Sequence, residues 1–173
     1  MLSAQAFPSA LSASRMAVRA LIIGNLVFGC LVLGLLVASL VAEEWVFGAL
    51  GVRLDERATL IPWGRIVMVI GIGSVPLTHV VLTRLLAIVE TVRLGDPFLI
   101  ENAARLKTMA WALLGLEVLH LALGGVAAAI SNTQLDLNWT FSITRWLAVL
   151  LLFVLAQVFD DGARLREDLR GTV

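Results

Sequence analysis

The sequence is poor in the groups that proteins use for cross-links, metal binding and charge. Only 15% of its 173 residues are charged, tyrosine is absent, and Cys30 is the single cysteine. One cysteine excludes an internal disulfide and any paired-cysteine metal site. Because the formal net charge is zero, no overall field attracts nucleic acid or an acidic substrate.

Catalytic motifs are also missing from the sequence. It contains no nucleophile elbow, no phosphate-binding glycine loop and no cytoplasmic pairing of a carboxylate with a histidine. We therefore expect neither enzymatic activity nor a cofactor, and no direct binding of nucleic acid.

Hydrophobic residues, in contrast, make up 60% of the chain. They form runs that reach the ~20 residues needed to cross a bilayer. Spans are predicted at about residues 20–42, 62–88, 109–130 and 143–160. The predicted fold is an all-α membrane protein, a four-helix transmembrane bundle in the lipid bilayer. Residues 19–173 form its single domain, and residues 1–18 are interpreted as a mobile cytoplasmic tail.

The first two spans carry a few residues that are unusual inside a membrane helix. The run 20–42 is interpreted as an uncleaved anchor; a cleaved signal peptide is the alternative, although its apolar core would be shorter. Asn25 is expected to hydrogen-bond another helix. Pro62 suits the first turn of the second span. Pro76 lies inside it and predicts a kink, because proline cannot bond the carbonyl of Ile72.

The basic residues predict the orientation. Nine of the thirteen lie on the side that holds both termini and the connection between the second and third spans. These nine are Arg15, Arg19, Arg84, Arg93, Arg105, Lys107, Arg164, Arg166 and Arg170. The other four are Arg53, Arg57, Arg65 and Arg145. Since the richer side faces the cytoplasm, both termini are predicted inside.

The segment before the fourth span alternates between apolar and polar residues. Its apolar members are Leu135, Leu137, Trp139, Phe141 and Ile143. A period of two is typical of a half-buried strand. A weaker alternation occurs around Val52 and Leu54, so a small extracytoplasmic β-ribbon is predicted. The alternative is a loop on the membrane interface, anchored by Trp139.

Three ionisable residues stand out inside the predicted spans: His79, Glu117 and His120. Such residues are costly in a bilayer and are candidates for function. Helical spacing places Glu117, His120 and Gly124 on one face. Counting residues from the inner boundary puts His79 at the depth of Glu117. We therefore predict a His–Glu–His cluster near the midplane, beside Pro76.

Three interpretations of this cluster remain open. It could relay protons or act as a protonation switch that bends the second span. It could instead be structural, with buried hydrogen bonds that fix the register of the helices. Two histidines and one carboxylate could also hold zinc, although only two of these ligands share a helix.

Two cytoplasmic passages have specific residue choices. In the first, Gly95 suits a helix C-terminus, Asp96 an N-cap and Pro97 a first helical position. Its further residues are Phe98, Glu101, Asn102, Arg105 and Leu106. The second passage follows the fourth span and contains Gly162, Arg164, Leu165, Asp168, Thr172 and Val173. We predict that Phe98 and Leu106 pack on Leu165, and that Arg105 pairs with Glu167 or Asp168.

Together the two passages resemble the DUF2975 family of small bacterial membrane proteins. The pair Asp160 and Asp161 departs from the charged pairs usual in that family. The resemblance implies four spans in the bacterial cytoplasmic (inner) membrane and no established activity. It also implies a small helix-turn-helix regulator as partner. We thus expect a membrane sensor or anchor that docks such a regulator. The alternatives are a small transporter or channel subunit, which would need a homo-oligomer, and a purely structural membrane protein.

Overall fold

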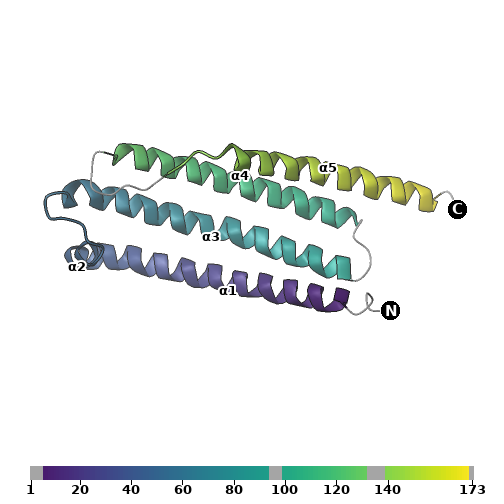
Figure 1. Ribbon diagram of the computed structural model, residues 1–173, viewed down its shortest axis with the longest axis horizontal. Coiled ribbons are helices and arrows are strands. Elements are labelled where there is room, and N and C mark those ends of the chain that lie inside the picture. The colour runs from purple at the N-terminus through teal and green to yellow at the C-terminus, as the bar shows by residue number, and fades with distance from the viewer. Residues whose placement is uncertain (1–5, 94–98, 132–138, 172–173) are drawn as a thin grey trace.

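The computed structural model describes residues 6–93, 99–131 and 139–171, and these form five helices (Figure 1). The helices are α1 (Ala6–Val41), α2 (Glu43–Ala49), α3 (Arg57–Arg93), α4 (Ile100–Ala129) and α5 (Ile143–Gly171). All but α2 are long and apolar enough to cross a membrane. The prediction of an all-α protein with four apolar spans is therefore confirmed.

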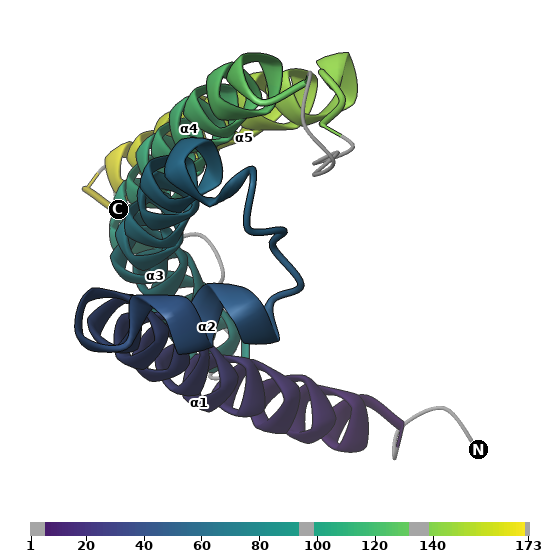
Figure 2. The same ribbon diagram turned by 90° about the vertical axis from the view of Figure 1, so that its left-hand side faces the viewer.

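The four long helices form an open, curved row. In chain order, α1 packs on α3, α3 on α4 and α4 on α5, and no comparable contact joins α1 to α5 in the described chain. Figure 2 shows the row from its end, with one side left open. The predicted bundle is thus not closed. An open row is tolerable in a bilayer, because lipid tails cover apolar side chains as well as another helix does.

Small and polar residues fix α1 against α3. The Asn25 side chain donates a hydrogen bond of 3.0 Å to the carbonyl of Val75, which confirms the helix-to-helix bond expected for Asn25. One turn along α1, a β-carbon added at Gly29 would lie 3.0 Å from the Val75 side chain, so glycine allows the close approach. Helix α3 continues through Pro62 and Pro76.

An ion pair lies near each end of α3, one to α1 and one to α2. At one end Arg15 lies 3.3 Å from Glu90, and at the other Arg65 lies 2.7 Å from Glu43. Since α1 begins at Ala6, the described part of the segment predicted as a mobile tail is helical instead. The contact with Glu90 gives that extension a partner on α3.

The connection between α1 and α3 is a short helix, α2, which lies across the end of α1 (Figure 2). It buries Phe47, which forms a small core with Val52, Leu60, Ile61 and Ile130. The weak alternation at Val52 and Leu54 thus belongs to a turn region and not to a strand. No strand occurs among the described residues, and residues 132–138, the centre of the predicted ribbon, lie outside them.

Helix α5 is displaced along α4. Its first turn lies beside the middle of α4, as the hydrogen bond between the Arg145 side chain and His120 shows. Further along, the rings of Phe153 and Trp111 meet edge to face with centroids 5.3 Å apart. The other end of α5 extends past the start of α4 (Figure 1). The described residues just ahead of α5, 139–142, are not helical.

Candidate functional site

The main candidate site is a polar group between the middle of α4 and the first turn of α5. Glu117 and His120 lie one turn apart on the same face of α4. Arg145 faces them from the first turn of α5, with its Nε 3.7 Å from Glu117 Oε1. Arg145 Nη2 also donates to His120 Nε2 and to the carbonyl of Thr140, at 3.2 Å in the second case. The arginine thus links the two ionisable residues of α4.

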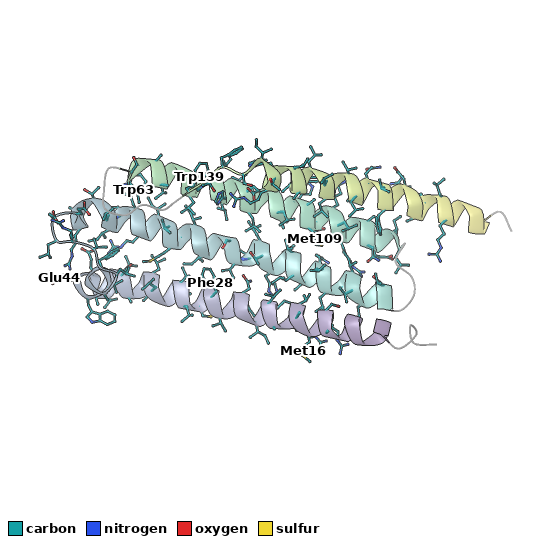
Figure 3. All side chains as sticks on the ribbon, viewed as in Figure 1. Met16, Phe28, Glu44, Trp63, Met109 and Trp139 are labelled. Atoms are coloured by element: carbon teal, nitrogen blue, oxygen red, sulfur yellow. The ribbon has the colours of Figure 1, made fainter. Side chains whose placement is uncertain are left out.

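The segment leading into α5 completes this site. Trp139 lies beside α4, just ahead of α5 (Figure 3). Its ring stacks on His120 with centroids 5.5 Å apart, and its Nε1 donates to the His120 carbonyl at 2.9 Å. A β-carbon at Gly124 would overlap the indole ring, so glycine is what lets Trp139 lie flat on α4. Trp139 therefore covers one face of the imidazole, while Arg145 bonds it at Nε2.

The structure does not bring His79 into this group. No hydrogen bond or ion pair joins His79 to Glu117 or His120 in the described chain, and its buried Nδ1 has no partner there. The reason is the register of the helices. Leu77 packs at Gly115 and Leu119 at Gly73, so His79 lies about one turn from the level of Glu117.

The zinc interpretation finds no support in the geometry. Within the described residues, no three His, Cys, Asp or Glu side chains come together as a metal-binding group. The positive partner at the site is instead Arg145, which lies inside the predicted span 143–160 although the orientation argument counted it with the other side. Its apolar neighbours 146–159 are fewer than the ~20 residues of a crossing, which was a signal that Arg145 belongs to the span.

A cavity of about 250 Å³ adjoins the site between α3 and α4. His120 and Ser74 are its polar lining residues, and the remainder of the lining is apolar or glycine. A second, apolar cavity of about 460 Å³ lies between α1, α2 and α3 and shares Val67 and Gly71 with the first.

At the opposite end, a buried hydrogen-bond group joins α3 to α4. Asn102 is fully buried; its Nδ2 donates to Thr91 Oγ1 at 2.9 Å, and its Oδ1 accepts from Arg105 Nη1 at 2.7 Å. The bonds of Arg105 thus stay at the α3–α4 connection and include the Ala87 carbonyl at 3.5 Å. The predicted partners Glu167 and Asp168 have side chains outside the described set.

The first turns of α4 and the middle of α5 meet across a cavity of about 330 Å³, and Arg164 is the predicted docking residue that lines it. Its lining residues are Ile100, Ala103, Ala104 and Lys107 from α4, and Phe153, Ala156, Gln157, Asp160 and Arg164 from α5. Within α5, Arg164 pairs with Asp160 at 2.8 Å, and Gln157 donates to Asp161 at 3.1 Å. Gln157 therefore bonds its own helix, and Arg164 pairs with Asp160 one turn earlier.

The other predicted docking residues differ in exposure. Leu106 is buried, Gly162 is half-buried, and Glu101 and Leu165 are exposed, Leu165 at 65%. The expected packing of Leu106 on Leu165 is therefore not observed. Gly95, Asp96, Pro97, Phe98, Thr172 and Val173 lie outside the described residues.

Comparison with protein-family models, with curated proteins and with solved structures gives no match for this chain.

Proposed function

We propose that this protein is a membrane sensor or anchor that docks a small cytoplasmic helix-turn-helix regulator. The observation that carries the proposal is the cavity between the start of α4 and the middle of α5, with Ala103 and Ala104 on one wall and Ala156 and Arg164 on the other. The packing of α4 on α5 does not by itself require such an opening, whereas a docking site does.

The chemistry of this cavity fits an amphipathic helix of a partner. Ile100 at its rim is 47% exposed and offers an apolar contact. Lys107 and Arg164 supply positive charge beside it. A partner helix with one apolar side chain flanked by acidic residues would match this arrangement.

The proposed orientation places this cavity in the cytoplasm. With Arg145 assigned to the membrane site, the basic residues left for the outer side are Arg53, Arg57 and Arg65. The bias that favours both termini inside therefore becomes larger. The bacterial inner membrane and membership of the DUF2975 family belong to the same proposal, and they rest on the residues of the two passages.

The docking proposal can be tested by blocking the cavity. Ala104 lines it and is exposed, so Ala104→Trp should fill the opening without disturbing a buried contact. The tagged protein is purified in mild detergent, and copurifying proteins are identified by mass spectrometry. We expect a small helix-turn-helix protein with the native chain, and its loss with Ala104→Trp.

The matched control is Ala128→Trp, the same change at an exposed position at the other end of α4. It should retain the partner. With the purified partner, binding to Ala104→Trp should weaken at least about 10-fold, or ~1.4 kcal/mol. Equal binding by both variants, or copurification of no such regulator, would refute the docking proposal.

A second candidate is a transporter or channel subunit, and the mid-depth site beside the His120 cavity is the observation that favours it. The open row of helices encloses no path by itself, so this function needs a homo-oligomer. A chain that remains monomeric in lipid nanodiscs would exclude it. A purely structural protein is the outcome if both experiments fail.

A further inference from the structure

We infer that His120 Nε2 is a proton-binding site, reached by water from the outer side, and that a proton there releases Arg145 and so acts on α5. This inference rests on the proposed sensor function and names its stimulus.

The hydrogen bonds define the protonation state of His120. Arginine has only donors, so the bond from Arg145 Nη2 requires a bare, accepting Nε2 on the imidazole. In the proposed resting state His120 is therefore neutral, with its proton on Nδ1. A second proton can be added only at Nε2, the atom that Arg145 occupies. Proton binding and the arginine bond thus exclude each other.

A new partner for the protonated ring is already in place. The Thr140 carbonyl lies 3.4 Å from His120 Nε2, and it now accepts from Arg145 Nη2 at 3.2 Å. After protonation, Nε2–H would donate to this carbonyl, and two cations would face each other. Arg145 would then keep Glu117, whose Oε1 is 3.7 Å from its Nε, as its remaining partner. One proton taken from water therefore replaces the Arg145 bonds to His120 and to the Thr140 carbonyl with a bond from His120 to that carbonyl.

The charged groups that face His120 in the described chain are these two, Glu117 on its own helix and Arg145 on α5. From α3, the cavity beside His120 is lined by Val67, Ile70, Gly71 and Ser74, none of which is charged.

The proposed water route follows the irregular segment ahead of α5. Residues 139–142 are irregular, Thr140 is exposed, and the Arg145 side chain is 40% exposed. Irregular backbone at membrane depth is tolerated where it is covered by protein or lines a water-filled cavity. Because a charged guanidinium is costly in contact with lipid tails, the exposed part of Arg145 favours the water-filled case.

Helix α5 connects this site to the cytoplasmic cavity. It is continuous from Ile143 to Gly171, so Arg145 in its first turn and Arg164 at the cavity belong to one rigid element. Release of Arg145 from His120 would let α5 shift along α4, and the shift would alter the cavity wall at Ala156 and Arg164.

Trp139 provides the test, because a protonated imidazole quenches the fluorescence of an indole stacked on it. Trp45, Trp63, Trp111 and Trp146 are replaced by Phe, and the protein is reconstituted in liposomes. Histidine ordinarily changes charge between about pH 5 and 8. We expect a reversible loss of Trp139 fluorescence on acidification over this range. Arg145→Gln removes the competing cation and should shift the midpoint to higher pH.

The chain offers a matched control, since His79 is its only other histidine. His79→Gln should leave the titration unchanged, whereas His120→Gln should abolish it. A flat curve in the native background, or a curve that persists in His120→Gln, would overturn the proposal.

A second measurement avoids the multiple tryptophan changes. In the native chain labelled with ¹⁵N-histidine, nitrogen chemical shifts at about pH 8 should identify one ring protonated at Nδ1 only, and acidification should convert it to the doubly protonated form. An Nε2–H tautomer at His120 would contradict the inference. Neither experiment involves the regulator, so a titrating His120 without a docked partner would remove the proposed function alone.

Discussion

Arg145 Nε lies 3.7 Å from Glu117 Oε1, although the two residues come from different crossings and meet at mid-depth. The carboxylate side chain is only 12% exposed, while that of the arginine is 40% exposed. Glu117 is thus the more deeply placed partner, and Arg145 is what compensates its charge. A carboxylate at this depth is stable only with such compensation.

Loss of the carboxylate should therefore destabilise the α4–α5 pair. Glu117→Gln leaves the arginine without a counter-ion, and we expect the free energy of unfolding to fall by about 1–2 kcal/mol, less than for a fully buried pair because Arg145 is partly exposed. Denaturation in mixed detergent micelles measures the change. The double variant Glu117→Gln with Arg145→Gln should recover part of the loss; two additive effects would argue against a coupled pair.

The α3–α4 connection should be sensitive at Asn102. This side chain is fully buried and bonds both Thr91 and Arg105, so Asn102→Ala leaves polar groups without their partner. We expect a loss of about 1–3 kcal/mol in the same unfolding assay. Glu101→Ala, an exposed neighbour, should change stability by less than about 0.5 kcal/mol. Similar losses in both variants would show that the hydrogen bonds are not responsible.

Two adjacent glycines should respond in opposite directions to the same substitution. A β-carbon at Gly124 would overlap the ring of Trp139, whereas at Gly125 it meets no atom of the described chain within 4 Å. Gly124→Ala should therefore cost about 1–3 kcal/mol, because the indole must leave its place on His120. Gly125→Ala should stabilise α4 by roughly 0.5–1 kcal/mol through helix propensity. Thermal unfolding of the two variants is the measurement, and a neutral Gly124→Ala would contradict the stacked arrangement.

Much of the fold followed from residue pattern. Apolar run length identified the long helices, and spacing placed Glu117 and His120 on one face. Asn25 was correctly expected to bond a neighbouring helix, because an amide in an apolar run has few other partners. These features depend on one helix at a time, so a single sequence carries them.

Features that depend on how two helices slide past each other were missed. The register of α3 on α4 separates His79 from Glu117, and the displacement of α5 brings Arg145 inward to His120. Such offsets are set by packing at small residues such as Gly115 and by the linker before α5, and periodicity contains no information on them. The short helix α2 was missed because it is too brief for a periodic signal.

Water access to the mid-depth site can be examined with cysteine labelling. Because Cys30 is the only cysteine, Cys30→Ser provides a cysteine-free background. Thr140 is exposed in the irregular segment ahead of α5, so Thr140→Cys should react with a membrane-impermeant maleimide added to the outer side of intact cells. Val118 is 54% exposed on the helical part of α4, where we expect lipid to cover an apolar side chain, and Val118→Cys should not react. Thiolate chemistry requires water, so equal labelling of both positions would mean that the whole face is hydrated. An unreactive Thr140→Cys would mean that protein or lipid seals the segment, and protons could then not reach His120 from that side.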